Sequence, residues 1–244
     1  MRTIYRATFV AIAFYWTALA GAQTTVPVDP PKVIQAKYPV PQRDADLRQS
    51  LYLYVEGQDL LRKDRVHEAL KAFEDAARLD PTSAAIVKAQ IPILIGFERF
   101  SDALTASKKV VELDRNDYSI WYVQAKLQRS FARYPEAIAA LETGVKSDLL
   151  KDHPEAAQQM YLELASLYEH TEKFGLAADA YNKAAAILEH PDQIAEKAHV
   201  PLEAVRARPA ETYEKIAQLY RKAKRYDDAM GAIKKAQERA PNRA

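Results

Sequence analysis

Residues 118–151 read YSIWYVQAKLQRSFARYPEAIAALETGVKSDLLK, and the order of small and large side chains in them predicts an architecture. Large apolar residues recur at helical spacing, while Ala125, Ala137 and Gly144 stand at positions 8, 20 and 27. Two antiparallel helices can approach closely only where a side chain is small, and large residues fill the space beside that contact. The stretch therefore predicts a pair of short antiparallel helices.

The centre of this pattern occurs five times along the chain. In each copy an aromatic or branched residue is followed three positions later by an alanine, and the alanines are 34, 34, 40 and 52 residues apart. The copies are Val66/Ala69, Phe100/Ala103, Tyr134/Ala137, Phe174/Ala177 and Tyr226/Ala229. A period of about 34 residues indicates a solenoid of helix–turn–helix repeats.

On these residues the chain resembles the tetratricopeptide repeat family, in an exported bacterial form. That family has small residues at positions 8, 20 and 27, an aromatic near 24 and proline at 32. The first repeat matches with Gly57, Ala69, Phe73, Ala76 and Pro81. The five segments are 50–83, 84–117, 118–151, 158–191 and 210–243. The resemblance implies an all-α, right-handed solenoid over residues 44–244 that binds other proteins and catalyses no reaction.

Two inserts and two ends depart from a plain solenoid. The inserts, 152–157 and 192–209, are expected to form loops, with a helix starting near Pro154 and a short helix between Pro201 and Pro209. At the N-terminal end, Asp44 is suited to cap a helix that begins before the first repeat. At the C-terminal end, polar residues at positions 28 and 30 of the last repeat predict a finished outer edge. These two residues are Gln237 and Arg239.

The first 22 residues have the order of a signal peptide. Arg2 and Arg6 precede an apolar run over 7–20, and small residues follow, so that cleavage fits after Ala20 or Ala22. An uncleaved anchor is the alternative, although the run of 14 residues is shorter than the roughly 20 that a membrane span needs. Residues 23–43 contain five prolines and predict an extended linker. We therefore expect an exported protein, periplasmic or secreted, without a stable membrane span after cleavage.

Composition excludes several kinds of chemistry. The chain has no cysteine, so it forms no disulfide and no thiolate metal site. It has no glycine-rich phosphate loop, no G-x-S-x-G turn and no H-E-x-x-H helix, and nothing in it predicts a cofactor, a metal or an enzyme. Without Arg2 and Arg6, 33 basic side chains face 33 acidic ones, which gives no support for a nucleic-acid partner. The oligomeric state stays open.

The resemblance also implies where a protein or peptide partner would bind. Ligands of this family usually lie along a concave groove lined by the first helix of each repeat. The candidate groove residues are Tyr54, Gln58, Leu61, Lys88, Tyr122, Lys126, Arg129 and Leu162. Some of them could equally be packing residues, and this alternative stays open. The function predicted is a non-catalytic scaffold in the cell envelope that holds a peptide or helix of its partner.

A basic run in the last repeat suggests an alternative function. Its residues, which we call the basic tip, are Arg221, Lys222, Lys224 and Arg225. An accessory factor of the envelope could dock through this tip on anionic surfaces or acidic partners. A solvated helix end is the plainer interpretation of the same residues, because Lys and Arg suit a helix C-terminus.

Overall fold

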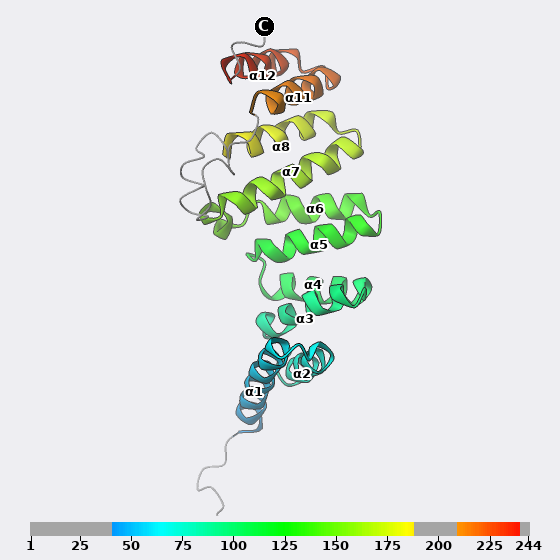
Figure 1. The fold of residues 1–244 in the computed structure, drawn as a ribbon, viewed down its shortest axis with the longest axis vertical. Helices are drawn as coiled ribbons and strands as arrows, with labels where there is room; N and C mark the ends of the chain where they lie inside the picture. The colour runs from blue at the N-terminus through cyan, green and yellow to red at the C-terminus, as the bar shows by residue number, and fades with distance from the viewer. Residues whose placement is uncertain (1–40, 188–208, 240–244) are drawn as a thin grey trace, which may run out of the picture. The chain divides into compact units, whose positions relative to one another are not determined.

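The computed structural model describes residues 41–187 and 209–239, and all regular structure in this part of the chain is helical (Figure 1). This agrees with the predicted all-α class. The α-helices are α1 (Gln42–Arg62), α2 (Val66–Leu79), α3 (Ala84–Gly96), α4 (Phe100–Leu113), α5 (Tyr118–Ser130), α6 (Tyr134–Gly144), α7 (Pro154–His170), α8 (Phe174–Ile187), α11 (Pro209–Lys222) and α12 (Tyr226–Arg239). A 3₁₀ helix, η1, spans Asp148–Asp152.

The helices are arranged as consecutive antiparallel pairs. The pairs α1/α2, α3/α4, α5/α6, α7/α8 and α11/α12 pack internally, and each second helix also contacts the first helix of the next pair (Figure 1). Each pair buries its apolar faces only against its neighbours, which is the packing of a solenoid. The predicted signal peptide, most of the proline-rich linker and nearly all of the second insert lie outside the described residues. Among the helices that the structure describes, none is long and apolar enough to cross a membrane.

A left-handed residue forms the turn inside every pair. The φ angles of these five residues lie between 56° and 59°, and all five stand at position 15 of the predicted repeats. They are Asp64, Glu98, Ala132, Glu172 and Lys224. The residue after each donates its backbone N–H to a carbonyl five residues earlier in the first helix, as Arg133 does to Gln128 at 2.9 Å. The turns therefore end each first helix with a local backbone bond, although none of them uses glycine.

Replacing one of these residues with glycine is expected to stabilise the protein. A residue other than glycine in the left-handed conformation destabilises the folded state by about 1–2 kcal/mol, and glycine relieves this strain. Glycine also gives the unfolded chain more conformational freedom, which opposes folding by about 0.5–1 kcal/mol. The net effect of Ala132→Gly should therefore be a free energy of unfolding higher by up to about 1 kcal/mol. Ala139→Gly, at an exposed position inside α6, should lower it by about 1 kcal/mol. Denaturant titration of both variants checks the prediction, and a lower stability of Ala132→Gly would contradict it.

The core consists of two apolar clusters that meet at α5. One is built mainly from α1 to α4 and the other from α6 to α12, and Trp121 packs against both. The alanines at position 20 lie where paired helices approach most closely, and Ala69, Ala103, Ala137 and Ala177 are fully buried. Small residues at these places therefore bring the helices together, as the sequence predicts.

Three local expectations need correction. Helix α1 begins at Gln42 and continues without a break to Arg62, so Asp44 lies in its first turn and caps no separate helix. Residues 154–157 of the first insert form the first turn of α7, which starts at Pro154 as predicted, so the insert lengthens a helix and is mostly not a loop.

The third correction concerns the C-terminal edge. Gln237 and Arg239 are exposed on α12, as predicted. However, Tyr226, Met230 and Ile233 on the same helix are exposed as well. The expectation of a finished polar edge is therefore wrong for these three residues.

Candidate functional site

The predicted groove residues lie on the first helices of the first four pairs, and their side chains differ in how far they are buried. Tyr54 and Leu61 of α1 pack against the N-terminal core cluster, and the Tyr54 ring centre lies 5.7 Å from that of Phe73. Tyr122 of α5 is also half-buried, and the Lys126 ammonium lies 5.7 Å from its ring centre. Lys126 itself and Leu162 of α7 are exposed. Part of the predicted groove is thus packing, and part is open surface.

Ion pairs connect successive first helices on this face. They engage two of the predicted groove cations, Lys88 and Arg129, with partners that the sequence did not suggest. The pairs are Lys88–Asp117 (2.5 Å), Arg129–Glu163 and Lys215–Glu169 (3.0 Å). Lys88 and Arg129 are therefore not free anchors for a partner, because Lys88 is held by Asp117 at the start of α5 and Arg129 by Glu163 of α7.

The ion pairs Arg129–Glu163 and Lys215–Glu169 use the same two repeat positions, but the positive and negative charges are exchanged between them. Position 12 of one repeat meets position 6 of the next, as Arg129 with Glu163 and then as Glu169 with Lys215. At the two earlier junctions these positions are apolar and pack against the N-terminal cluster: they hold Leu61 and Ala89, then Ile95 and Val123. Positions 12 and 6 are consequently apolar at the first two junctions and charged but paired at the last two.

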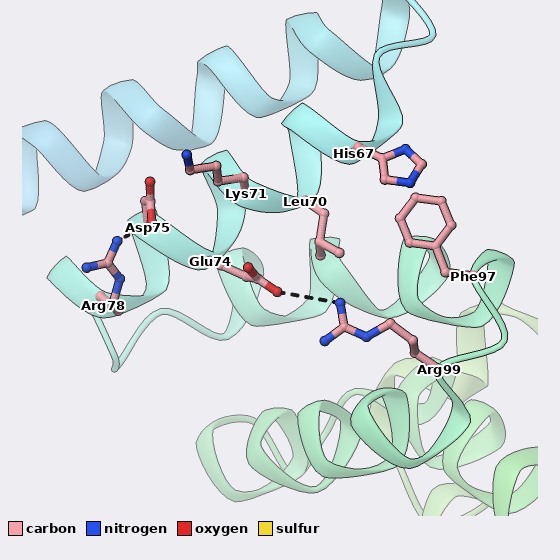
Figure 2. Close-up of a pocket in the computed structure, with 8 residues that line it drawn as sticks. All are labelled: His67, Leu70, Lys71, Glu74, Asp75, Arg78, Phe97 and Arg99. Carbon is pink, nitrogen blue, oxygen red and sulfur yellow. Dashed lines mark hydrogen bonds and ion pairs between the residues drawn. The ribbon is translucent and has the colours of Figure 1, made fainter.

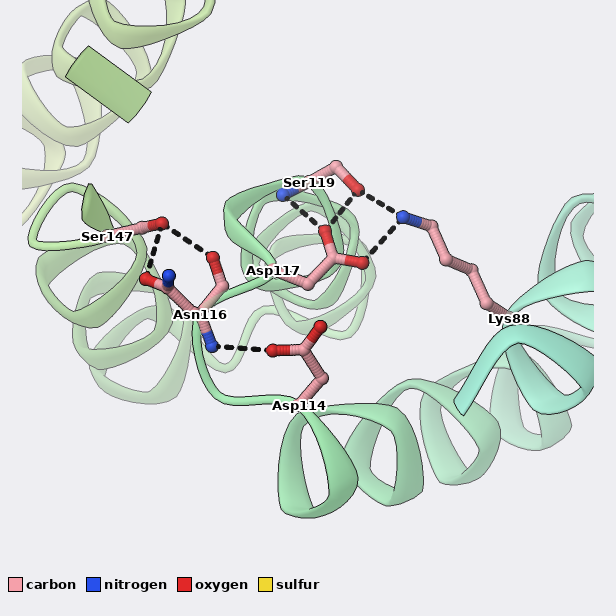
Figure 3. Close-up of polar contacts among 6 residues, drawn as sticks. All are labelled: Lys88, Asp114, Asn116, Asp117, Ser119 and Ser147. Atoms are coloured by element: carbon pink, nitrogen blue, oxygen red, sulfur yellow. Dashed lines mark hydrogen bonds and ion pairs between the residues drawn. The ribbon is translucent and has the colours of Figure 1, made fainter. Parts of the chain in front are cut away.

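Polar contacts at the start of α5 join the second and third repeats (Figure 3). Asp117 caps α5 by accepting from the Ser119 N–H at 3.1 Å. Lys88 of α3 donates to Asp117 and to the Ser119 hydroxyl, the latter at 3.0 Å. On the other side, the buried Ser147 after α6 donates its hydroxyl to the Asn116 carbonyl at 2.5 Å. These contacts fix the start of α5 to α3 of the second repeat and to the segment that follows α6 in the third repeat.

The Asp117 contacts predict a loss of stability in acid. Partial burial opposes ionisation of Asp117, but the hydrogen bonds from Lys88 and Ser119 outweigh it and hold its pKa below the ordinary value of 3.8. A lowered pKa in the folded state adds stability above the ordinary pKa, and this stability is lost as the pH falls through the folded value. We expect Lys88→Met to lose less unfolding free energy than the parent between pH 5 and pH 2, measured by denaturant titration.

Lys146→Met is the matched control for this prediction. Lys146 is exposed, and the described residues show no ion pair for it. Its acid profile should follow that of the parent, and equal profiles for the parent and Lys88→Met would refute the role of the Lys88–Asp117 pair.

The basic tip is less free than its sequence suggests. Arg225 donates to Asp179 of α8 and to Asp228 of α12, both at 2.7 Å, and these two carboxylates raise its pKa. The Lys222 ammonium lies 4.9 Å from the ring centre of Phe174. Arg225 and Lys222 thus join the last pair of helices to α8, and Arg221 and Lys224 are left as exposed cations.

A surface cavity of about 970 Å³ lies away from the predicted groove residues, along α2 and the turn before α4 (Figure 2). At one end the His67 and Phe97 rings face each other, with ring centres 4.4 Å apart. Arg99 approaches Glu74 to 3.9 Å. The other lining residues are Leu70, Lys71, Asp75 and Arg78. Sequence reasoning missed this cavity because its residues come from second helices and a turn, outside the groove positions.

A smaller cavity of about 390 Å³ lies among α6, α7 and α8. On its wall the Tyr168 hydroxyl donates to Glu142, and burial together with this carboxylate raises the pKa of Tyr168. Asp179, also on the wall, accepts from Tyr220 at 2.8 Å. Both carboxylates are thus already engaged, and over the described ranges no three acidic or histidine side chains converge as metal ligands.

The comparisons with known proteins agree with this arrangement. Models described as tetratricopeptide repeat match residues 122–190 and 210–243. No curated protein matches the chain in sequence.

Solved structures match over most of the chain. A MamA crystal structure is 18% identical, covers 79% of this chain and 92% of its own, and has a TM-score of 0.55. MamA from Desulfovibrio magneticus RS-1 is 16% identical, covers 80% and 97%, and has a TM-score of 0.50. YrrB, described as a TPR protein with an unusual peptide-binding site, is 12% identical, covers 83% and 91%, and has a TM-score of 0.53.

At these identities the structures are similar in fold alone. They share the paired-helix solenoid, and the repeat models match this chain over its third, fourth and fifth helix pairs. The chain is therefore a tetratricopeptide repeat protein, with the all-α, right-handed solenoid of that family.

Proposed function

We propose that this protein is a non-catalytic protein–protein interaction scaffold of the cell envelope, which binds a peptide or helix of its partner along the face of its first helices. The fold supports a binding role, because repeats of this kind present extended surfaces. The order of residues 1–22 supports export. YrrB, which shares the fold, is described as having a peptide-binding site.

One observation carries the choice of surface. The ion pairs between first helices engage Lys88 and Arg129, while Lys126 stays exposed near the half-buried Tyr122 ring and Leu162 is exposed on the next first helix, α7. An apolar side chain, an aromatic ring and a single cation with no carboxylate partner among the described residues suit a peptide that offers an apolar residue and an acidic group. The binding energy would come mainly from apolar contact, so it should depend only weakly on salt.

Affinity capture from the envelope fraction tests this proposal. The parent chain and Leu162→Glu are used as baits at low and moderate salt, and Leu149→Glu serves as a matched control. Leu149 is similarly exposed but lies in η1, away from the first-helix face. The proposal predicts partners that survive moderate salt, are kept by Leu149→Glu and are lost with Leu162→Glu. A Leu162→Glu bait that keeps every partner would show that this face does not bind them.

A further inference from the structure

The last described helix carries an uncovered apolar stripe. Tyr226, Met230 and Ile233 are four and three residues apart, so they share one face of α12. They are 62%, 65% and 40% exposed. Met230 stands at position 21 of its repeat, where the four earlier repeats hold side chains that are at most 5% exposed: Leu70, Leu104, Ile138 and Ala178. Thus α12 presents the face with which every earlier second helix receives the next pair.

The first helix carries the opposite half of such a junction. Tyr52, at position 3, is 62% exposed, and Val55, one turn further along α1, is 57% exposed. At position 3 of the next three repeats, Ile86, Ile120 and Met160 are only 1–5% exposed, because the preceding pair covers them. The face of α1 that bears Tyr52 is therefore the face that the next three first helices bury.

We propose that α12 of one copy receives α1 of a second copy, so that the chain associates head to tail. The occupant follows from the chain itself, which carries both halves of a junction that it already forms four times between its own pairs. Covering the large apolar side chains of both faces would remove them from water, which is the main driving force for such contacts. A partner with unrelated side chains would not need to match either face.

A recurring ring contact fits the same arrangement. Across two internal junctions, the residue at position 13 of a first helix lies against the aromatic residue at position 17 of the preceding second helix. His170 lies 4.3 Å from Tyr134, and the Lys222 ammonium lies 4.9 Å from Phe174, both measured to ring centres. In the proposed contact Arg62 and Tyr226 occupy these two positions. Both are exposed, and Arg62 has no ion pair or ring contact within the part of the chain that the structure describes.

A head-to-tail contact joins the α12 face of one copy to the α1 face of the next. The assembly therefore keeps a free α1 face at one end and a free α12 face at the other, where further copies can add. The groove residues proposed to bind a partner, such as Lys126 and Leu162, belong to neither face. Association therefore increases the number of partner-binding faces in one assembly, and it does not depend on the proposed partner.

Sedimentation velocity of the purified, natively processed chain tests this proposal at increasing concentration up to about 100 µM, a range that detects weak association. Met230→Glu blocks the α12 face, and Tyr52→Glu blocks the α1 face. A carboxylate buried among apolar side chains should weaken the contact about tenfold or more. Leu149→Glu is the matched control, because Leu149 is also an exposed apolar residue but lies on neither face.

The expected result has three parts. The parent and Leu149→Glu grow beyond a dimer as concentration rises, each face variant alone stays monomeric, and an equimolar mixture of Met230→Glu with Tyr52→Glu gives a dimer that grows no further. That dimer forms because each partner keeps the face that the other has lost. Circular dichroism should show unchanged helix content, because both substitutions are at exposed sites.

Other outcomes overturn the proposal. A parent that stays monomeric throughout would show that the two faces do not associate. Loss of association with Met230→Glu but not with Tyr52→Glu would indicate a symmetric contact between two α12 helices. A mixture of the two variants that forms no dimer would equally exclude the head-to-tail contact.

Discussion

Gly144→Ala is expected to lower the free energy of unfolding by about 1–3 kcal/mol, the usual cost of overfilling a packed site. A Cβ atom at Gly144 would lie 2.5 Å from the terminal methyl of Met160 and 2.8 Å from Cβ of Trp121. The Met160 methyl can swing aside, but Trp121 Cβ is attached to the backbone of α5 and cannot. The paired helices α5 and α6 would have to separate. Denaturant titration measures the loss.

Gly231→Ala is the matched control for this substitution. Gly231 lies inside α12, and a Cβ atom there would meet nothing within 4 Å. Alanine is favoured over glycine in a helix by about 0.5–1 kcal/mol, so this variant should be more stable than the parent. Changes of the same sign in both variants would contradict the assignment of Gly144 to the close approach of α5 and α6.

Ala137→Leu should have a comparable or larger effect. Ala137 is fully buried at position 20, where α6 approaches its neighbours, and leucine adds three carbon atoms for which the cluster has no space. The loss should be about 1–3 kcal/mol, and a chain of this size loses roughly 2–4 °C of melting temperature per kcal/mol. Thermal unfolding followed by circular dichroism measures the shift.

Ala139→Leu provides the comparison on the same helix. Ala139 is exposed two residues further along α6, so leucine there enters solvent and should shift the melting temperature by little more than 1 °C. Equal melting temperatures for the two leucine variants would show that position 20 is not a close contact.

The helix pairs could be predicted from the sequence because their packing is local and periodic. Ala137 and Gly144 mark where α5 and α6 approach, and Pro154 marks the start of α7. The turn at position 15 was harder to predict, because Ala132 and Glu172 give no chemical sign of a left-handed backbone. There the ends of two packed helices impose the conformation on whichever residue connects them.

The candidate groove was predictable in its positions and less so in its charges. Lys88 and Arg129 look free in the sequence, but their partners Asp117 and Glu163 lie 29 and 34 residues away. A signal was present, since opposite charges about one repeat apart are brought together when repeats stack. It could be used only with the stacking geometry known. The exposed α12 stripe escaped notice for a similar reason, because Met230 resembles the apolar residues that earlier repeats bury.

The position of Trp121 between the two apolar clusters has an experimental consequence. In a solenoid each repeat depends on its neighbours, and the place where two clusters meet is where a cooperative unit can divide. The chain has two tryptophans, and removal of residues 1–22 would take away Trp16 and leave Trp121. Its fluorescence would then report the integrity of that boundary, while circular dichroism reports all the helices together. Non-coincident transitions by these two signals would mark the protein as two folding units joined at α5.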